Sequence, residues 1–314
     1  MKTDCKIGIV GVGLMGHGIA LNILRAGWPL GYVRHAGNQP TEDLDDLGAC
    51  GVDDLADLAR SADVVLLCLN GSPQVEAVML GADGLLTHLR PGSVVVDCST
   101  AIPSSTRQIA AHVAKAGSRF MDAAMTRTPI EAREGRLNLL IGADPSLLDE
   151  VIPLLACFSE HRFHAGDVGA GHALKLLHNF VSLGTVTLIS EAFACANASG
   201  VSADILVDVL RTGGGHGAAL DRLAPFVLDG DTSRLRFSVA NARKDLDYYV
   251  TLAQHAGALH GVADGVLDAL ASMETAGMAA RYMAEAPDAL ADLARSGKDD
   301  PGTGTPGPSP ARHS

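Results

Sequence analysis

The 314-residue sequence is poor in aromatic residues and in charge, and both shortages limit what the chain can be. Aromatic residues make up 4% and charged residues 19%, whereas hydrophobic residues make up 47%. This composition supports a sizeable core and excludes a disordered polymer. Positive charge is scarce, since the net charge is −12, and this argues against nucleic acid as a partner. A chain of this length predicts two domains.

Paired cysteines and metal-binding motifs are also missing. The six cysteines occur singly, with no CxxC motif, which is typical of small buried side chains in a reducing compartment. His161 with His164, and His172 with His178, have no Cys or carboxylate partners at ligand spacing. The sequence therefore predicts no metal site.

No uninterrupted apolar run reaches the ~18 residues that a transmembrane helix needs. The most apolar segment, residues 176–189, is interrupted or bordered by His178, Asn179 and Glu191, so we expect a buried helix there. The first apolar run begins near Lys6, which leaves no room for a signal peptide. These absences predict a soluble, cytoplasmic protein.

Short apolar runs rich in β-branched residues alternate with helical patterns through the first half of the chain, as expected for parallel strands covered on both faces. The predicted strands are residues 6–10, 30–33, 64–69, 93–97, 120–123 and 137–141. The predicted helices are residues 15–26, 53–60, 73–80, 103–116 and 145–156. This alternation predicts an α/β Rossmann domain with a doubly wound parallel sheet.

After Gly169 the pattern is helical only. One long helix is predicted at residues 172–199, and at ~1.5 Å per residue it would span about 40 Å, enough to connect two domains. Further helices are predicted at residues 202–212, 239–256 and 262–278. We therefore predict a Rossmann domain at 1–168, an all-α domain at 169–295 and a disordered tail at 296–314, where Pro, Gly, Ser and Thr dominate.

A glycine motif marks the predicted cofactor site. The segment KIGIVGVGLMGHGIALNILRAG reads as a strand, then Gly11-x-Gly13-x-x-Gly16, then a helix. Gly11 permits a tight turn, Gly13 leaves room for a pyrophosphate, and Gly16 lets the helix pack against the strand. The free N–H groups at the start of the helix favour phosphate. The motif therefore predicts a bound dinucleotide, NAD or NADP.

The end of the second predicted strand bears on which dinucleotide is bound. An acidic residue there would bind the ribose hydroxyls of NAD, but the segment reads Tyr32-Val33-Arg34-His35. Arg34 can donate charge-assisted hydrogen bonds to a 2′-phosphate, so NADP is favoured. The alternative is that Arg34 stacks on adenine or lies in solvent, and that either cofactor is accepted.

Five motifs follow one another along the chain: GVGLMGHGIALNIL, DCSTAIPSST, MDAAMTRTPIEAREGRLNLLIGA, GDVGAGHALKLLHNF and FSVANARKDLDYY. Their order and spacing over residues 6–290 resemble the 3-hydroxyisobutyrate dehydrogenase family of β-hydroxyacid dehydrogenases, which is related to 6-phosphogluconate dehydrogenase. The resemblance implies an all-α domain that dimerises and hydride transfer in a cleft between the domains. It implies a homodimer or homotetramer that acts on a small anionic hydroxy acid or its aldehyde form.

The resemblance also implies that Lys175, in the segment GAGHALKLLHN, is catalytic. Reduction of a carbonyl leaves a developing alkoxide, which needs a proton and positive charge, and a neighbouring amine supplies both. Asn179 lies four residues later on the same helix face, where its amide can bind the substrate hydroxyl or hold the lysine. The apolar neighbours Leu174, Leu176 and Leu177 argue against a solvated surface lysine.

Two polar residues follow the predicted strand at 93–97, at the edge of the sheet where α/β proteins bind ligands. The resemblance places Ser99 by the substrate and Thr100 by the nicotinamide. A Ser/Thr pair shortly before Pro103 also fits a helix cap, and that role is compatible with both of the others.

Two residues of the second half complete the expected site. Lys244-Asp245 resembles the late Lys-Asp pair of the family, which closes over the cofactor; the alternative is a plain charge pair on a helix. His216, in the loop 213–217, is expected to line the substrate pocket. The expected cofactor contacts are Gly11, Gly13, Leu14, Met15, Gly16, Arg34, His35, Leu69, Asn70, Thr100 and Lys244.

The segment Thr126-Arg127-Thr128 departs from the family's pattern. The family commonly has Ser-Gly-Gly here, whose backbone grips the substrate carboxylate. An arginine fork fits a carboxylate, sulfonate or phosphonate, and the segment resembles the Gly-Arg-Thr of sulfolactaldehyde reductases in the same family. We predict that the three residues bind the substrate head group. The alternative is that Arg127 pairs with Glu131 or Glu134 at a helix start.

Three functions remain open. The first is a dehydrogenase of a small 3-hydroxy acid or its semialdehyde, with a reductase of a sulfonated or other anionic aldehyde as its variant. The second is an imine reductase, although these enzymes usually lack the lysine. The third is a non-catalytic dinucleotide-binding module, although such members lose the lysine and gain basic extensions. The presence of Lys175 argues against the second and the third.

Overall fold

The computed structural model describes residues 5–296, which form two compact units. Of the described residues, the first unit comprises 5–178 together with 251–258, and the second comprises 179–250 and 259–296. Helix α8, Ala170–Ala198, runs through this division, so a domain boundary after residue 168 stays a prediction. The predicted disordered tail lies outside the described residues, apart from Ser296.

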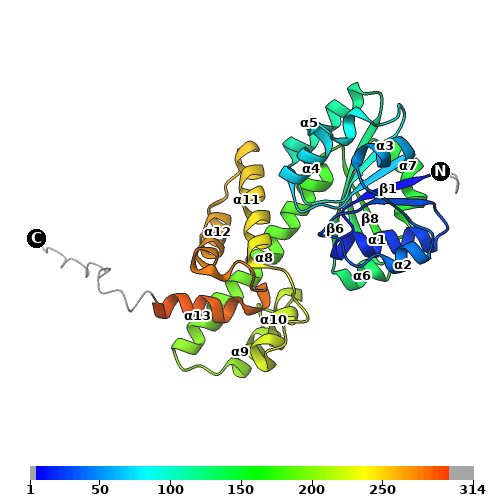
Figure 1. The fold of residues 1–314 in the computed structure, drawn as a ribbon. Helices are drawn as coiled ribbons and strands as arrows, with labels where there is room; N and C mark the ends of the chain where they lie inside the picture. The colour runs from blue at the N-terminus through cyan, green and yellow to red at the C-terminus, as the bar shows by residue number, and fades with distance from the viewer. Residues whose placement is uncertain (1–4, 297–314) are drawn as a thin grey trace, which may run out of the picture. The chain divides into compact units, whose positions relative to one another are not determined.

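An eight-stranded sheet forms the centre of the first unit (Figure 1). The strands run in the order β3-β2-β1-β4-β5-β6-β7-β8. Their bounds are β1 Ile7–Val10, β2 Leu30–Val33, β3 Cys50–Val52, β4 Val64–Leu67, β5 Val94–Asp97, β6 Arg119–Thr126, β7 Leu137–Gly142 and β8 Ser159–Gly166. The predicted α/β Rossmann fold is therefore confirmed.

One strand pair corrects the expectation of a fully parallel sheet. Strands β6 and β7 pair antiparallel, whereas all the other neighbouring strands pair in parallel. Residues 127–136 alone connect β6 with β7. A parallel crossover needs about a dozen residues or more, so this shorter link favours a direct reversal of the chain.

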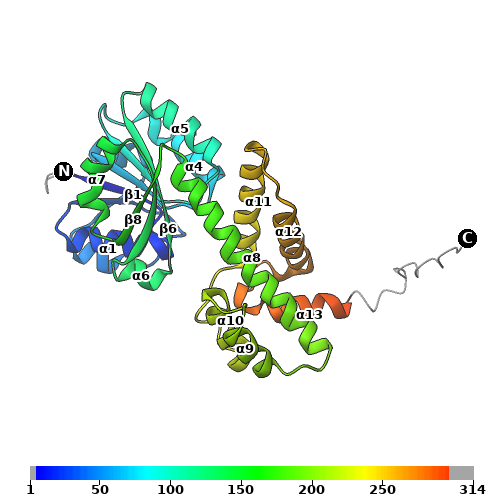
Figure 2. The same ribbon diagram turned by 180° about the vertical axis from the view of Figure 1, so that it is seen from behind.

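Helices cover both faces of the sheet (Figures 1 and 2). One apolar core lies between the sheet and α1, α2, α6 and α7, and the other lies between the sheet and α3, α4 and α5. Val64 and Leu66 of β4 face the first core, while Val65 and Leu67 face the second. The helices are α1 Leu14–Arg25, α2 Glu42–Asp46, α3 Leu55–Ser61, α4 Ser72–Leu80, η1 Leu85–Thr87, α5 Pro103–Lys115, α6 Pro129–Arg133 and α7 Pro145–Leu155.

The second unit is helical, as predicted. Its described residues hold one isolated β-bridge, between Ser238 and Tyr282. Two apolar clusters lie along α8, one with Leu183 and Val186 and the other with Ile189 and Phe193. The other helices are α9 Ala203–Thr212, α10 Ala218–Asp229, α11 Val239–His255, α12 Gly261–Met273, the π-turn η2 Glu274–Met278, η3 Met283–Glu285 and α13 Ala286–Ser296.

Helix α8 is long and apolar enough, by composition alone, to cross a membrane. It is the one such helix among the described residues, with a mean hydropathy of 1.3 in its most apolar window, of which 44% is buried. Its buried side chains Leu183, Val186, Ile189 and Phe193 all pack in the clusters of the second unit. Packing in the core of the second unit therefore accounts for part of its apolar character.

Several elements differ from the sequence-based expectation. Strands β3 and β8 and helices α2, α6, α10 and α13 were not predicted. The predicted helix at 262–278 ends instead in a π-turn, in which Gly277 has a left-handed φ of 81°. Since glycine adopts positive φ without strain, it ends the regular helix there.

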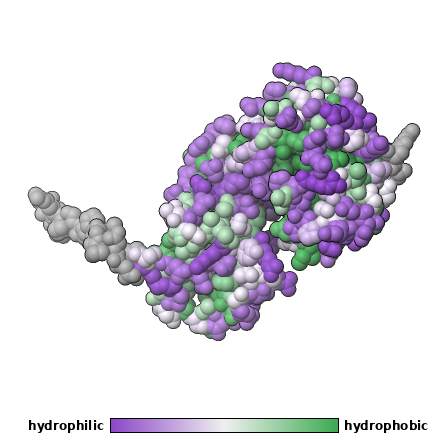
Figure 3. Space-filling view, viewed as in Figure 1, coloured by the Kyte–Doolittle hydropathy of each residue, from purple (hydrophilic) through white to green (hydrophobic). Residues whose placement is uncertain are grey.

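The cysteines only partly match the expectation of buried thiols. All six are free thiols, and Cys98 is buried. Cys50, at the start of the edge strand β3, and Cys195, on α8, are exposed, so the expectation is wrong for these two. On the face shown in Figure 3, purple hydrophilic residues surround smaller green apolar areas in both units, as is normal for a protein surface.

Candidate active site

The glycine turn between β1 and α1 has the geometry that a dinucleotide needs. Gly11 has a φ of 97°, and a Cβ atom there would lie 2.2 Å from the carbonyl oxygen of Cys68. A Cβ atom on Gly16 would lie 1.9 Å from the carbonyl oxygen of Gly11, so neither position accepts a larger residue. A Cβ atom on Gly13 would meet nothing closer than 3.9 Å, which leaves the space at this residue open for a ligand.

The start of α1 is suited to an anion. No side chain caps its first turn, and the first turn holds no acidic residue. The first-turn N–H groups and the positive end of the helix dipole therefore fit a pyrophosphate. Leu14 is 65% exposed and Met15 is partly buried at this helix start. These residues fit the dinucleotide that the sequence predicts, and their contacts with it stay a prediction.

Arg34 and His35 follow β2 at the same edge of the sheet. The Arg34 guanidinium lies over Gly51, where a Cβ atom would come within 2.8 Å of it, and it forms an ion pair of 3.0 Å with Asp53. Arg34 is exposed, so a ligand can reach it. Asn38, which the sequence did not single out, donates to the carbonyl of Val33 at 2.9 Å and accepts from the amide of Val12 at 3.3 Å. Asn38 thus holds this loop against the glycine turn.

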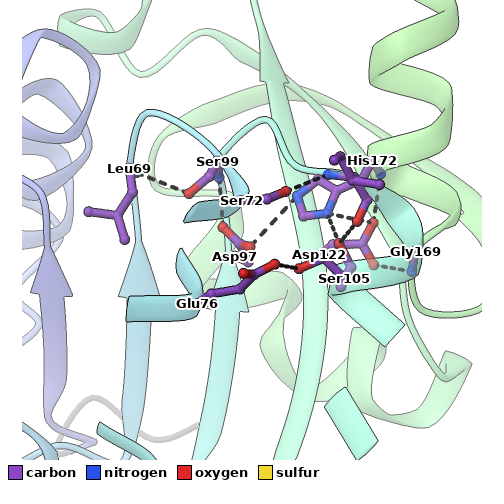
Figure 4. Close-up of polar contacts among 11 residues, drawn as sticks. Leu69, Ser72, Glu76, Asp97, Ser99, Ser105, Asp122, Gly169 and His172 are labelled. Atoms are coloured by element: carbon purple, nitrogen blue, oxygen red, sulfur yellow. Dashed lines mark hydrogen bonds and ion pairs between the residues drawn. The ribbon is translucent and has the colours of Figure 1, made fainter. Parts of the chain in front are cut away.

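Ser99 is buried and connects the loops that follow β4 and β5 (Figure 4). Its hydroxyl oxygen accepts from the amide of Leu69 at 3.0 Å, and its own amide donates to Asp97 at 2.9 Å. The structure therefore brings together the expected site residues Leu69, Asn70, Ser99 and Thr100. The hydroxyl oxygen of Ser99 already accepts a backbone bond, whereas Thr100 is partly exposed.

The segment 126–128 joins β6 to α6. Thr126 is buried, and its hydroxyl accepts from the amide of Asn138 at 3.1 Å. Thr128 caps α6 in a capping box with Glu131, whose carboxylate accepts from the Thr128 amide at 2.9 Å. Between these two fixed residues Arg127 has a φ of 83°, in the left-handed region. The conformation that a glycine would favour at this position is therefore retained.

The partner of Arg127 differs from those considered in the sequence. Its guanidinium donates through Nη1 to the carboxylate of Glu160 on β8 and to the carbonyl of Arg136. Glu131 is engaged with Thr128 instead, so an ion pair of Arg127 with Glu131 or Glu134 is wrong. Both contacts use one guanidinium nitrogen, and a guanidinium has further donors for another anion.

A buried polar cluster lies where β5, β6, α5 and α8 meet (Figure 4). Asp122 accepts from the amides of Gly169 and His172 at 2.6 and 2.7 Å and so caps the start of α8. The His172 ring contacts the hydroxyl of Thr106 through Nδ1 at 2.7 Å, and its Nε2 lies 3.9 Å from Asp97 Oδ2. Sequence analysis missed Asp97, Asp122 and this role of His172, because no local pattern brings them together.

Burial raises the pKa of Asp97. The nearby His172 ring and the hydrogen bonds from Ser99 act in the opposite direction, and the carboxylate of Asp122 adds to the rise. Burial likewise raises the pKa of the Cys68 thiol to about 12, with the neighbouring Asp97 contributing. Burial at the carboxyl ends of β4 and β5 therefore disfavours the negatively charged forms of Cys68 and Asp97.

Lys175 lies in the second turn of α8, in the first unit. It is half-buried, while Leu176 beside it is fully buried. It follows His172 by three residues, so the two side chains lie about one helical turn apart on the same side of α8. Asp122 therefore holds the same helix end that carries Lys175.

The second unit holds the other expected polar residues. Asn179 is buried and donates to the buried carboxylate of Asp245 at 2.6 Å. Lys244 pairs with the same carboxylate at 3.1 Å, and its amine lies 5.5 Å from the centre of the Tyr248 ring. The structure therefore links Asn179 and Lys244 through Asp245, the second residue of the Lys-Asp pair.

His216 is exposed, in the loop between α9 and α10. Its contribution to a substrate pocket stays a prediction. Within residues 5–296, no group of three or more His, Cys, Asp or Glu side chains could hold a metal ion.

Comparison with known proteins relates both halves of the chain to one group of enzymes. Residues 6–166 match the NAD-binding domain of 6-phosphogluconate dehydrogenase, and residues 169–290 match the NAD-binding domain of NADP-dependent 3-hydroxyisobutyrate dehydrogenase. The NAD-dependent L-serine dehydrogenase of Pseudomonas aeruginosa is 33% identical over 221 residues, which cover 70% of this chain and 74% of that enzyme.

Solved structures agree with this relation. The 3-hydroxyisobutyrate dehydrogenase of Mycobacterium tuberculosis, solved with L-serine, superimposes with a TM-score of 0.80 at 25% identity, covering 91% of this chain and 99% of that one. An imine reductase of Myxococcus stipitatus, in complex with NAD+, gives a TM-score of 0.60 at 21% identity over 91% of this chain and 99% of that one. The second likeness is one of fold alone.

Proposed function

This chain belongs to the 3-hydroxyisobutyrate dehydrogenase family of β-hydroxyacid dehydrogenases, and we propose that it moves a hydride between NADP and a small 3-hydroxy acid or its semialdehyde, with Lys175 as acid and base. Membership makes it an NAD(P)-dependent oxidoreductase that acts on CH–OH donors. The observation that carries the proposal is the half-buried Lys175 on a helix whose start is bound to the sheet through Asp122. We place the enzyme in the cytoplasm.

We assign cofactor binding, proton transfer and substrate binding to different residues of this chain. Gly11, Gly13 and Gly16 would hold the dinucleotide, whose nicotinamide supplies or accepts the hydride when it is bound. In reduction the Lys175 ammonium donates a proton to the substrate oxygen and stabilises its developing negative charge. In oxidation the neutral amine takes the proton from the substrate hydroxyl. Asn179, one turn later on α8, is the second group proposed to bind that hydroxyl.

Replacement of Lys175 by methionine tests the proposal. We expect Lys175→Met to lower kcat by about 10²- to 10⁴-fold, because general acid–base catalysis contributes about that much. The assay is NADPH oxidation with small aldehydes that carry a carboxylate or a sulfonate, and with cyclic imines. Lys115→Met, at the exposed end of α5, is the matched control and should keep full activity. Unchanged activity of Lys175→Met would reject Lys175 as the proton donor.

Cofactor choice forms part of the proposal. The exposed Arg34, with no acidic residue beside it in the segment 32–35, favours the 2′-phosphate of NADP. We expect Arg34→Ala to raise the KM for NADPH about 10- to 100-fold, since a hydrogen bond to a charged group contributes about 1.5–3 kcal/mol, while the KM for NADH stays the same. Arg60→Ala, which removes another exposed ion-paired arginine, is the control. An equal loss with both cofactors would contradict the preference for NADP.

A reductase of a sulfonated or other anionic aldehyde is the second candidate. Arg127 favours it, because its left-handed backbone and its contact with Glu160 place a guanidinium at the end of β6. The comparison to make is kcat/KM for a carboxylated and for a sulfonated aldehyde, in the wild type and in Arg127→Gly. If the ratio between the two substrates is the same in both proteins, Arg127 does not select the head group.

An imine reductase is the remaining enzyme candidate, and the fold is compatible with it. The two enzyme classes differ in their need for an oxygen-directed proton donor on α8. Imine reduction that survives in Lys175→Met, with aldehyde reduction lost, would favour the imine reductase. A chain that binds NADPH without turnover of any substrate class would indicate a non-catalytic module.

A further inference from the structure

Asp97 on β5 and His172 on α8 face each other, and neither side chain takes part in the chemistry proposed above. Asp97 is 1% exposed and His172 is 0% exposed. Two of their atoms, Asp97 Oδ2 and His172 Nε2, make no hydrogen bond to any described residue and lie 3.9 Å apart (Figure 4). Buried polar atoms are nearly always satisfied, so this facing pair calls for an explanation.

Their neighbours leave little choice of partner. Both oxygens of Asp122 are occupied by the amides of Gly169 and His172. A Cβ atom on Gly171 would lie 2.8 Å from Asp122 and 2.3 Å from the carbonyl oxygen of Leu140, so the start of α8 is packed directly on the sheet. The other carboxylate oxygen of Asp97 is occupied by the Ser99 amide. Asp97 Oδ2 and His172 Nε2 therefore have only each other.

The charges of the cluster point to a shared proton. Two dry carboxylates without a proton or a cation between them are costly, because burial strongly disfavours unpaired charge. Asp122 is compensated as an anion by two amides and by the positive end of the α8 dipole. Asp97 has one amide, from Ser99. One proton carried by the pair, on either Asp97 Oδ2 or His172 Nε2, removes the uncompensated charge, since 3.9 Å is an ion-pair distance and is longer than a hydrogen bond.

This pair connects the predicted cofactor loops to the helix of Lys175. Asp97 accepts from Ser99, and Ser99 accepts from Leu69, so one end of the connection holds the loops after β4 and β5. The other end is the first turn of α8, and Lys175 follows His172 by one turn. All five residues belong to the first unit. A displacement of about 1 Å at a reacting group can cost about 10²-fold in rate.

We propose that Asp97 and His172 share one proton, and that this buried pair positions the Lys175 amine relative to the loops that follow β4 and β5. The inference rests on the proposed role of Lys175. Both members are positioning residues, since they act on the reaction through Lys175 and not by touching the substrate.

Two substitutions of His172 replace the ring by amide side chains of different length. The amide of His172→Gln extends to about the place of Nε2 and can still face Asp97. The amide of His172→Asn ends at about the place of Nδ1 and can serve only Thr106. We expect His172→Asn to lower kcat about 10- to 100-fold with the KM for NADPH within about twofold of the wild type, and His172→Gln to restore most of the loss.

The pH profile of Asp97→Asn tests the shared proton. Its amide oxygen would accept from Ser99, so its NH₂ group faces the His172 ring and carries no proton that titrates. In the wild type, burial raises the pKa of Asp97, so the pair keeps its proton beyond the usual range of a carboxylic acid and loses it only as the pH rises further. A carboxylate then faces the ring without a proton between them, and α8 loses this contact. We expect kcat of the wild type, relative to Asp97→Asn, to fall at least about tenfold as the pH rises from 6 to 9. The titratable or charged groups around the pair are Asp122 on β6, Cys68 after β4, Cys98 after β5 and Arg107 on α5, and Lys175 follows one turn later on α8.

The controls separate positioning from simple loss of stability. Ser190→Ala removes another buried hydroxyl from α8, bonded to the carbonyl of Val186, and should leave kcat and the pH profile unchanged. The rate at which formaldehyde and cyanoborohydride methylate Lys175, followed by mass spectrometry across the same pH range, reports on the amine without any turnover. It should change in Asp97→Asn and in His172→Asn.

Two results would overturn the proposal. One is equal kcat in His172→Asn and His172→Gln, and the other is a pH profile of Asp97→Asn that superimposes on that of the wild type. If His172→Asn does not fold, Asp97→Asn alone decides. An inactive Lys175→Met with unaffected Asp97 and His172 variants rejects the positioning pair and leaves the proposed function standing. An active Lys175→Met rejects the proposed function itself.

Discussion

Arg127 is the one non-glycine residue among residues 5–296 with a positive φ. Its neighbours Thr126 and Thr128 are both held, one by Asn138 and the other by the capping box with Glu131. The left-handed conformation costs an L-residue roughly 1–2 kcal/mol. Strain of this kind gathers at functional sites, so its place in the expected substrate loop supports a role in binding.

Glycine and alanine at residue 127 should reverse their usual order of stability. Arg127→Gly and Arg127→Ala both lose the contact with Glu160, but only alanine keeps the backbone strain. We expect the glycine variant to have the higher free energy of unfolding, by about 0.5–1 kcal/mol, in urea titrations. An alanine variant as stable as the glycine variant would show that φ at this residue relaxes.

Asp97 should make stability depend on pH. Because burial raises the pKa of Asp97, the folded chain keeps the one proton that Asp97 and His172 share at pH values above about 6.5, where an unfolded acid and an unfolded imidazole have both lost theirs. The free energy of unfolding therefore falls as the pH rises above about 6.5. In Asp97→Asn this decline should be smaller, as measured by urea unfolding between about pH 6 and pH 9. Parallel curves for the two proteins would contradict the assignment.

Local sequence predicted the residues of the glycine turn, because the turn itself and the close approach of Gly16 to the carbonyl oxygen of Gly11 depend on neighbours in the chain. It could not predict the pairing of Asp97 with His172, or of Asn179 with Asp245, because each pair joins distant elements. For the same reason it misassigned the partner of Arg127, which lies on β8 rather than in the adjacent helix.

Among the elements, the start of α8 depends most on a single side chain. The carboxylate of Asp122 accepts two amides there while fully buried, and no described residue replaces it. Gly142 and Gly171 allow this approach, since a Cβ atom on either would lie within 2.8 Å of Asp122. The helix that carries Lys175 is therefore anchored at its N-terminus to β6.

Asp122→Ala should destabilise the protein by at least about 2 kcal/mol, because it removes a helix cap and leaves two buried amides without an acceptor. Asp144→Ala removes the cap of α7, which is exposed to water, and should cost less. Urea unfolding of both variants provides the comparison. A loss for Asp122→Ala no larger than that for Asp144→Ala would mean that α8 is held mainly by packing.

The two strands that sequence patterns missed have little apolar signal. Strand β8, SEHRFHAG, is an edge strand with mostly exposed side chains, so it has no apolar run to reveal it. Strand β3 has only three residues, none of them buried. Helices α10 and α13 were missed although each has a regular apolar face. The long apolar strands were found because both of their faces are buried.

At the scale of the whole molecule, we propose that an exposed apolar stripe on α8 is a surface for self-association. Leu177, Val181 and Leu188 lie on one side of this helix at spacings of four and seven residues, and Val181 and Leu188 are 66% and 70% exposed. Apolar side chains grouped in this way commonly mark an interface. A homodimer built on α8, or a homotetramer of such dimers, would cover the stripe.

Charge on this stripe should separate the subunits. We expect Val181→Glu and Leu188→Glu to reduce the molar mass measured by light scattering after size exclusion from at least that of a dimer to that of a monomer. Leu47→Glu, which places the same charge on an exposed leucine of the first unit, should keep the assembly of the wild type. A wild-type protein with the mass of one chain would reject the stripe as an interface.

The exposed thiols offer a way to follow the two units in solution. Cys50 lies in the first unit and Cys195 in the second, and both are open to reagents. Cys98 is buried and Cys68 has a pKa of about 12, so both should stay protonated and unlabelled near neutral pH. Once Cys5→Ser and Cys157→Ser remove the two partly exposed thiols, nitroxide labels on Cys50 and Cys195 would report the distance between the units by paramagnetic resonance, before and after addition of NADPH.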